Sequence, residues 1–358
     1  MIEILELREE YNNLWEDFLK NNEESKFYHS VRFKEVIEKT YKNCAGKYFF
    51  ILNDKKVSAI FPFFFVKSKI FGNRLISLPF LDSGGFIGTY KKEDLTFLLE
   101  ELKKIKDLDE IEIKLNTFME NYGKNGKILS SLNFVEKNNK NQIFLKIEGA
   151  DAMWGNLSRI TKKGIKKAEK SNLRIEEITN EEELKRFYSL YENNMKSFGS
   201  PQHSYQYFLN LFSVMKNNFR GLNCYKESKL ISSLIVFFSK NYIHAAFNPS
   251  DGDYLVYQPN DLLHWETIKW AEKKGVKYFD IGQCDIDAQN DTRAGGILRF
   301  KKKWNGVIYE KKSFLYYINN NKKTGGNSKL KRFSFLWKKL PIFFTRVVGP
   351  KINSQLGV

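Results

Sequence analysis

The sequence predicts an α/β protein of the α+β kind. Two tandem copies of one unit, each a mixed and largely antiparallel sheet flanked by helices, precede a basic amphipathic tail. Three observations predict this fold. The order of helices and strands repeats along the chain, and 31 Phe within 42% hydrophobic residues supply material for two cores. The end of the chain is basic throughout. We expect a first domain over residues 1–150, a second over 151–318 that opens with a basic helix, and a tail over 319–358.

The first copy begins with a helix and a three-stranded antiparallel meander. Its segments, in chain order, are a helix at 33–41, strands at 47–52, 57–66 and 74–80, a helix at 93–106 and a strand at 110–115. Leucines at 95, 98, 99 and 102 follow the spacing of one helical face. The apolar run at 60–66 is too short to span a bilayer as a helix and predicts a buried strand.

The second copy repeats this order. Its segments are helices at 184–195 and 205–215, strands at 221–225, 230–238 and 241–247, a helix at 260–275 and a strand at 277–283. Asn260 is a candidate N-cap of the last helix, and Gly275 is a candidate residue to end it. Self-similarity over half a chain indicates a duplication.

Helix, antiparallel meander, helix and strand is the order of the acetyltransferase superfamily (GNAT) core. In that core the sheet splays open and an acyl donor binds in the split. The topology alone leaves a second interpretation open, in which the same elements pack as a generic α+β unit without a site.

A basic helix is predicted between the copies, capped by Ser158 or Asn156 and ending near residue 171. Four of its basic side chains share one stripe: Arg159, Lys162, Lys166 and Lys170. Like charges along a helix repel, and phosphates of RNA, a nucleotide sugar or a lipid pyrophosphate would offset that cost. An ordinary solvated lysine-rich face is the alternative.

The positive charge is concentrated at the C-terminal end. Eleven Lys and Arg and no acidic residue follow residue 310, so the net charge of +17 less these 11 leaves +6 for the rest. Trp337, Leu340, Phe343, Phe344 and Val347 are interleaved with basic residues, and Pro341 divides the segment. Such a segment suits an anionic membrane surface, with a packed C-terminal helix as the alternative. Residues 319–321 and 325–326 are a candidate hinge before it.

The cysteines and the N-terminus predict a cytoplasmic protein, with peripheral attachment to the inner face of the cell membrane through the tail. Cys44, Cys224 and Cys284 are widely spaced and odd in number, which is typical of reduced thiols. The acidic, amphipathic N-terminus has neither the basic region nor the long apolar region of a signal peptide.

Several motifs together resemble the FemAB/FemX family, the non-ribosomal peptidyltransferases of peptidoglycan cross-bridges, and especially its relatives found with exopolysaccharide systems. The motifs are SLPFLDSGG at 77–85, WGNLSRITKKGIKKAEKSNLRI at 154–175, the segment around GSPQHS at 199–204, YQPNDLLHWETIKWAEKKGVKYFDIGQC at 257–284, LRFKKKWNG at 298–306 and LWKKLPIFFTRVVGPKINSQLG at 336–357. Lys162-Lys163 stands where the family usually carries Arg-Asn, which removes a planar fork for phosphate.

The resemblance implies an N-acyltransferase. It would move an aminoacyl or other acyl group onto an amine of a cell-envelope peptide, saccharide or lipid-linked precursor. The donor would be a co-substrate, aminoacyl-tRNA or acyl-CoA, with no tightly bound cofactor. tRNA is accordingly a candidate partner, beside the envelope-precursor acceptor and the membrane surface. A catalytically inert scaffold that binds membrane or polyanion is the alternative from another class.

The resemblance also implies the catalytic residue. Lys301, after Phe300, matches the family's Phe-Lys motif, whose lysine meets charge in the transition state. Without the family it would be one of three successive surface lysines. We expect Lys302 and Lys303 to be nearly silent when substituted. No metal-ligand cluster and no nucleophile–His–acid grouping stands out, so direct transfer is the simpler mechanism.

Further candidate site residues come from loops and strand ends. The catalytic candidates are His203 and Asp280, and the candidate substrate-binding residues are Asp82, Gly84, Gly85, Arg159, Lys162, Lys166, Tyr257, Asn260 and Phe300. Several of these residues have a structural alternative. His203 could be an ordinary polar residue of the surface, the glycines could form a turn, Asp280 could cap a turn and Asn260 could cap a helix. The loop at 248–261 lacks the glycine-rich pyrophosphate motif of ordinary acetyl-CoA enzymes.

Overall fold

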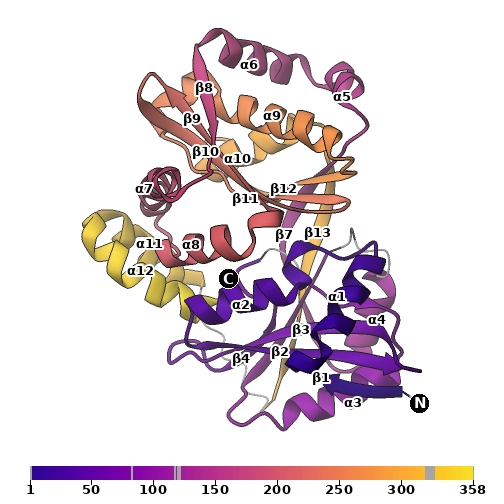
Figure 1. Cartoon of the computed structure of the whole chain (residues 1–358). Helices are drawn as coiled ribbons and strands as arrows, with labels where there is room; N and C mark the ends of the chain where they lie inside the picture. The colour runs from indigo at the N-terminus through magenta and orange to yellow at the C-terminus, as the bar shows by residue number, and fades with distance from the viewer. Residues whose placement is uncertain (1, 82–83, 117, 119–121, 319–326, 358) are drawn as a thin grey trace. The chain divides into compact units, whose positions relative to one another are not determined.

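The computed structural model describes residues 2–81, 84–116, 118, 122–318 and 327–357, and the chain forms two compact units (Figure 1). The first unit comprises Met1–Lys140, Tyr309–Asn327 and Lys351–Val358. The second comprises Asn141–Ile308 and Ser328–Pro350.

The first unit contains a sheet flanked by helices. Across the sheet its strands are β1 (Ile2–Glu6), β2 (Cys44–Asn53), β3 (Lys56–Val66), β4 (Arg74–Ser77), β6 (Glu110–Asn116) and β13 (Val307–Tyr317), and β5 (Ile87–Gly88) also pairs with β3. Neighbours are antiparallel except β4 and β6, which are parallel. The helices are α1 (Asn12–Asn21), α2 (Val31–Thr40), α3 (Lys92–Lys103) and α4 (Tyr122–Ser131), with 3₁₀ turns η1 (Glu9–Tyr11) and η2 (Phe27–His29).

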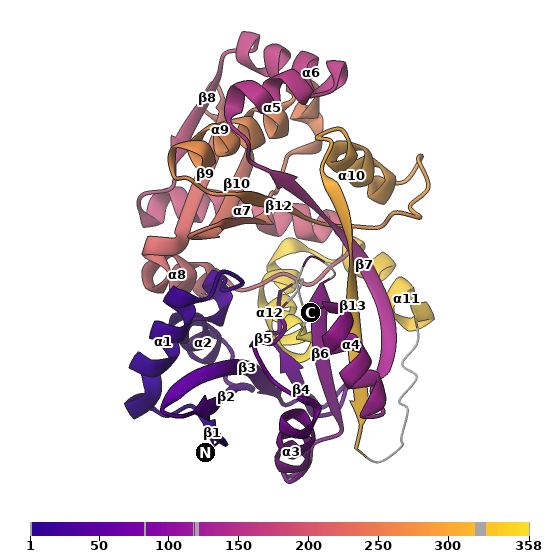
Figure 2. The ribbon, with the colours of Figure 1, turned by 90° about the vertical axis from the view of Figure 1, so that its right-hand side faces the viewer.

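The second unit repeats this plan. Its strands run β8 (Leu173–Glu177), β9 (Phe219–Lys226), β10 (Lys229–Ser239), β11 (Tyr242–Phe247), β12 (Tyr278–Cys284) and β7 (Val135–Lys146). Its helices are α5 (Ala150–Asn156), α6 (Arg159–Lys170), α7 (Glu181–Phe198), α8 (Tyr205–Val214), α9 (Pro259–Lys273) and α10 (Arg293–Lys302), with 3₁₀ turns η3 (Lys216–Asn218) and η4 (Gly252–Tyr257). The strands β11 and β12 are parallel, and their neighbours pair antiparallel. In Figure 2, α6 lies beside α9, against which it packs.

The predicted fold class and the internal repeat are confirmed. In each unit three consecutive antiparallel strands are followed by a helix and then by a strand that runs parallel to the third of them. These strands are β2, β3, β4 and β6 in the first unit and β9, β10, β11 and β12 in the second. Local chemistry explains the boundaries. The β2–β3 turn places Asp54 and Lys55 at φ +46° and +64°, the conformation that tight hairpins require. Helix α2 begins where Ser30 Oγ accepts a hydrogen bond from the Phe33 amide.

Phenylalanine contributes to the core of the first unit beside leucine and isoleucine. The apolar run predicted to be a buried strand is part of β3, where residues 59–66 are all buried. The Phe86 ring lies 4.7 Å from that of Phe61 and 5.4 Å from that of Phe63 between centroids, at angles that favour edge-to-face contact. The core of the second unit is mainly aliphatic, with Ile231, Leu234 and Ile243 fully buried.

The compact units divide the chain differently from the predicted domains. The second unit begins at Asn141, so the last residues of β7 belong to it, and β13 returns the chain to the first unit. The predicted tail is not a separate body. Helix α11 (Asn327–Lys339) and most of α12 (Ile342–Leu356) belong to the second unit, and Lys351–Val358 belongs to the first. Pro341 separates the two helices as predicted, whereas the candidate hinge at 319–321 and 325–326 lies outside the described residues.

Candidate active site

The parallel strands β11 and β12 separate in the middle of the second unit's sheet. Tyr242 pairs with Tyr278, Ile243 with Phe279 and His244 with Asp280, and the pairing ends there although both strands continue. β12 also shifts its register against β7 between Asp280 and Gln283. A bulge of this kind frees backbone groups from the ladder.

Lys301 reaches this point of separation. It lies in the last turn of α10, which begins where Thr292 Oγ1 accepts from the Gly295 amide at 3.0 Å. The half-buried Lys301 donates from Nζ to the Gln283 carbonyl oxygen at 2.8 Å. A Cβ on Gly282, whose φ is +83°, would lie 2.9 Å from Lys301 Nζ and 3.4 Å from the Ala245 carbonyl oxygen. Glycine at 282 therefore leaves space for the ammonium between the two strands.

Asp280 anchors the backbone next to Lys301. Its Oδ2 accepts from Tyr242 Oη at 2.7 Å and Gln142 Nε2 at 3.1 Å, and it lies 2.9 Å from His244 Nδ1. Its Oδ1 accepts from the Gly282 amide at 2.8 Å. The carboxylate thus ties β7, β11 and the bulge of β12 together.

The same contacts keep Asp280 ionised. Burial alone would raise the pKa of its carboxyl, but His244, Tyr242 and the Gly282 amide together hold that pKa below its usual range. The side chain is 0% exposed. Enclosure by four partners favours a positioning role for this carboxylate over direct contact with a substrate, and its predicted catalytic role stays a prediction.

His203 lies in an aromatic pocket rather than on the polar surface that its alternative reading supposed. Its ring stacks on Tyr207 at 4.1 Å between centroids and meets Phe247 edge-on at 5.9 Å. Burial lowers the pKa of the imidazole to about 3, so it remains neutral near pH 7. Its role in acid–base chemistry or substrate contact stays a prediction that its 7% exposure disfavours.

Lys303 is a structural residue, contrary to the expectation for a surface lysine. Its Nζ lies 2.5 Å from Oδ1 of Asp261, whose side chain is 1% exposed. Its backbone carbonyl accepts from Thr161 Oγ1 at 2.7 Å, which ties α10 to α6. Lys302 is exposed, as expected.

Phe300 is half-buried beside Lys301. Its ring lies 5.0 Å from His264 and 6.4 Å from Trp304. Burial, and secondarily the charges of Lys301 and Lys303, lower the pKa of His264 to about 3, so this imidazole is neutral. Direct substrate contact by Phe300 remains a prediction.

Asn260 is not the N-cap of α9. Gln258, in the left-handed conformation at φ +58°, takes that position, and Pro259 opens the helix. The Asn260 side-chain oxygen instead accepts from Ser232 Oγ at 2.6 Å and Ser250 Oγ at 2.9 Å, which closes the loop before α9. Tyr257 lies in η4, with Lys226 Nζ 5.3 Å from its ring centroid. Gly275, at φ +68°, follows the C-cap of α9 as predicted.

Helix α6 exposes much of its predicted basic stripe. Ser158 is the cap, accepting from the Thr161 amide at 3.1 Å, whereas Asn156 ends α5. Arg159 and Lys166 are exposed, and Lys162 Nζ donates to the Gly155 carbonyl at 2.9 Å. The opposite face is pressed onto α9 so closely that a Cβ on Gly164 would clash with Asp261.

The glycine-rich candidates belong to the first unit. Gly84 and Gly85 are buried, and a Cβ on Gly84 would lie 2.5 Å from that of Leu78. Leu78 and Phe80 have φ of +50° and +64°, a strained conformation for bulky residues. Asp82 lies outside the described residues.

Sequence reasoning missed His244, Tyr242, Gln142 and Gly282. A signal was present: Tyr242 and His244 alternate on an otherwise apolar strand, which places two polar side chains on one face. Their partner Asp280 is 36 and 38 residues away, and only the parallel pairing brings the three together.

Within the described parts of the chain, no group of three or more His, Cys, Asp or Glu side chains is arranged to hold a metal ion. The three cysteines are buried and unbridged. Among these same residues no helix is both long and apolar enough to cross a membrane.

Residues 156–301, which lie within the second unit, match the acetyltransferase (GNAT) domain family. The structure also matches a tandem GNAT protein from the clavulanic acid biosynthesis pathway, at a TM-score of 0.56 with 9% identity over 89% of this chain and 99% of that one.

More particularly, the comparisons confirm the resemblance to the FemAB/FemX family. A crystal structure of FemX matches with a TM-score of 0.71 and 16% identity over 88% of this chain and 97% of that chain. The lipid II:glycine glycyltransferase of Staphylococcus epidermidis is 28% identical over 94 residues, which are 26% of this chain and 23% of the relative. That of Staphylococcus haemolyticus is 27% identical over 90 residues, 25% and 22% of the two chains. The aligned segments thus span less than a quarter of the length of these curated relatives.

Proposed function

We propose that the protein is an N-acyltransferase that joins an aminoacyl or other acyl group to an amine on a cell-envelope precursor. The observation that carries the proposal is the ammonium of Lys301, held at the separation of β11 and β12 by the Gln283 carbonyl. The GNAT match over residues 156–301 and the similarity to enzymes named for glycyl transfer to lipid II support it.

The chemistry needs an oriented pair of reactants and stabilisation of developing negative charge. The acceptor amine forms a bond to the donor's carbonyl carbon, and the bond from that carbon to the donor's oxygen or sulfur breaks. The proton lost by the amine ends on the departing group. Lys301 contributes a fixed positive charge beside the oxyanion or the departing atom and takes no part in covalent bonding.

The donor is aminoacyl-tRNA or acyl-CoA, and the exposed stripe of α6 is our candidate surface for its phosphates. Incubation of the protein with charged tRNA and with acyl-CoA in separate reactions, each with an amine acceptor such as a lipid-linked peptide, identifies the donor. We expect acceptor-dependent consumption of one of them. No consumption of either donor with peptide, saccharide or lipid-linked amines would favour the inert scaffold.

An anionic membrane surface is the further partner that we propose, through one face of α11 and α12. Trp337 is 1% exposed and Arg346 pairs with Glu192, so the helix pair is anchored to the second unit. Its other face exposes five large apolar side chains between 42% and 68%: Phe335, Leu336, Phe343, Phe344 and Val347. Lys338 and Lys339 are exposed between them. Apolar side chains beside lysines, without acidic residues, complement an anionic bilayer.

A further inference from the structure

The second unit contains an open cavity of about 800 Å³ that none of the predicted site residues lines. It lies between α7, the β9–β10 turn, the start of η4 and the first residue of α10. This volume is within the range of cavities that hold ligands of nucleotide size.

The lining suits an organic body with polar edges. Leu190, Leu230 and Leu255 supply apolar surface. Hydroxyl and amide groups lie around them, among them Ser189, Asn193 and Ser228. A nucleoside or sugar offers both apolar faces and hydrogen-bonding groups, and so matches both kinds of lining surface.

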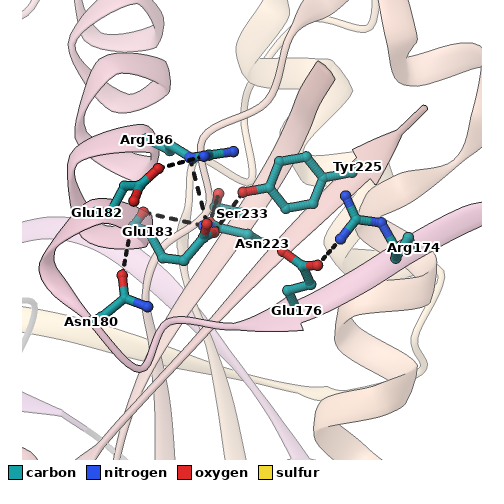
Figure 3. A network of polar contacts seen from close by, with 9 residues as sticks. All are labelled: Arg174, Glu176, Asn180, Glu182, Glu183, Arg186, Asn223, Tyr225 and Ser233. Carbon is teal, nitrogen blue, oxygen red and sulfur yellow. Dashed lines mark hydrogen bonds and ion pairs between the residues drawn. The ribbon is translucent and has the colours of Figure 1, made fainter. Parts of the chain in front are cut away.

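Two of the three cations at the cavity are already neutralised. Arg186 Nη2 lies 2.6 Å from Glu182, and its Nε lies 3.5 Å from Glu183, which also accepts from Tyr225 (Figure 3). Lys229 Nζ lies 2.9 Å from Asp251. A ligand anion would therefore have to compete with these carboxylates for Arg186 and Lys229.

Arg293 is the third cation. Its guanidinium carbon lies 3.5 Å from the centroid of the Phe198 ring, and its Nη1 donates to Ser197 Oγ at 2.8 Å. Among the described residues, no carboxylate lies within 4.0 Å of it. The Arg293 side chain is exposed, so a ligand in the cavity can reach this guanidinium. An oriented guanidinium with remaining donors matches the oxygens of one phosphate.

The helix that carries Arg293 also carries the candidate catalytic lysine. Arg293 and Lys301 are eight residues apart on α10. At the helical rise this separates their Cα atoms by about 12 Å along the axis. A ligand whose phosphate contacts Arg293 is therefore within molecular reach of Lys301.

We propose that this cavity binds the phosphate-bearing nucleotide part of the acyl donor, with Arg293 on the phosphate. Adenosine with a phosphate is the chemistry that acyl-CoA and the 3′ end of an aminoacyl-tRNA share. The assignment of the ligand as a donor rests on the proposed acyltransferase function.

Calorimetric titration of the full-length protein with adenosine and with adenosine monophosphate tests the site without turnover. We expect the monophosphate to bind more tightly. Arg293→Met should weaken it about 10- to 100-fold, the usual worth of charge-assisted hydrogen bonds, and leave adenosine nearly unchanged. Arg299→Met, on the same helix, is the matched control and should bind as wild type. Asn193→Trp, which fills the cavity from an exposed position, should weaken both ligands.

Titration with coenzyme A and with the trinucleotide CpCpA distinguishes the two sources of the nucleotide. The source that serves as donor should bind more tightly and lose affinity in Arg293→Met. Binding of neither, or equal affinities in wild type and Arg293→Met, would overturn the proposal while leaving turnover and the role of Lys301 intact. Arg293-dependent binding without any acyl transfer would instead count against the proposed function and against the donor assignment.

Discussion

Three consecutive lysines at the end of α10 have three different environments. Lys301 reaches the Gln283 carbonyl, Lys302 faces solvent, and Lys303 pairs with the buried carboxylate of Asp261. The direction of each side chain follows from its angular position on the last helical turn. Substitution of each lysine with Met therefore compares the effects of removing a charge from the candidate site, from the surface and from a buried ion pair.

Lys303→Met should destabilise the protein. It leaves the Asp261 carboxylate buried without its ion pair, and removing one partner of such a pair costs about 3–5 kcal/mol. Urea denaturation should show this loss, and Lys302→Met should match wild type. Asp261→Asn combined with Lys303→Met should recover part of the loss; equal stability of Lys302→Met and Lys303→Met would refute the structural role of this pair.

Asp280→Asn should also lower stability, in a way that depends on pH. The folded-state pKa of Asp280 is depressed, so its ionisation stabilises the fold above the unfolded pKa, about 4, and this contribution is lost as pH falls through the folded value. Thermal unfolding near pH 7 should show a deficit of about 3–5 kcal/mol, as for other broken buried pairs. The deficit should shrink as the pH falls below 4. A pH-independent deficit would contradict the charge-based account, and the exposed Asp291→Asn is the control.

Candidate residues could be chosen from the sequence where a motif of neighbouring residues marks them. Lys301 could be singled out because its flanking residues resemble a known motif. The partners of Asp280 could not, because they come from β7, β11 and the bulge of β12, which meet only in the sheet. His203 was predicted as a catalytic candidate with polar surface as its alternative, and neither reveals its aromatic pocket, because the rings come from α8 and β11.

At the scale of elements, α6 shows how one helix serves two purposes. Thr161, Gly164, Ile165 and Ala168 are buried and allow close packing on α9. Its basic side chains are left toward solvent, where repulsion between them makes a phosphate partner favourable. The buried face of α6 stabilises its packing on α9, and the proposed phosphate contact would explain why the exposed face of α6 is basic.

Charge reversal on α6 should weaken binding of the phosphate-bearing substrate. We choose Arg159→Glu with Lys166→Glu because both side chains are exposed, whereas Lys162 is held by the Gly155 carbonyl. The apparent KM should rise about tenfold or more at low salt. The difference from wild type should narrow as salt is added, because the free energy gained by releasing each counterion falls as the salt concentration rises. Thermal stability should hardly change.

Lys216→Glu with Lys273→Glu changes the net charge of the second unit equally at other exposed positions and is the control. An unchanged KM in the α6 variant at low salt, or an equal rise of KM in both variants, would indicate that the basic stripe is an ordinary solvated face without a substrate contact.

Helices and strands could be told apart from the periodicity of apolar residues, whereas the residues at which some helices begin or end could not be predicted. The Ser158 cap, the Gly275 stop and the break at Pro341 all follow from local backbone chemistry. The cap of α9 was misplaced because Gln258 adopts a left-handed conformation that Asn more often takes, while Asn260 is engaged by serines from β10 and the preceding loop. Such contacts override local preference.

At the scale of the whole molecule, the repeat was visible in sequence and the connections were not. β7 and β13 lie where the chain passes from one unit to the other, so the domain boundaries cannot be read from one continuous segment. The division of the C-terminal helices between the two units could not be read from the sequence for a similar reason. Trp337 is buried in the second unit, and Arg74 of the first unit donates to the carbonyls of Gln355 and Leu356. These contacts join residues more than a hundred positions apart.

The apolar face of α11 and α12 should bind anionic vesicles. Phe343→Ser with Phe344→Ser should reduce flotation with phosphatidylglycerol vesicles severalfold, because both side chains are exposed and their burial in the bilayer interface is lost. Phe97→Ser removes a comparably exposed ring from α3 of the first unit and should float as wild type. Vesicles of phosphatidylcholine should bind weakly. Equal flotation of all three proteins, or self-association relieved by the double variant, would indicate another role for this face.

Substitution of Lys301 with Met tests the central claim most directly. The change keeps the length of the side chain and removes only the charge at the separation of β11 and β12. The measurement is the steady-state kinetics of acyl transfer, with donor and acceptor varied in turn, for wild type, Lys301→Met and Lys302→Met. We predict that Lys301→Met lowers kcat about 10²–10³-fold with much smaller changes in KM, because the lost contact acts mainly in the transition state. Lys302→Met should keep full activity; equal turnover of the two variants, or a raised KM with unchanged kcat in Lys301→Met, would contradict the account.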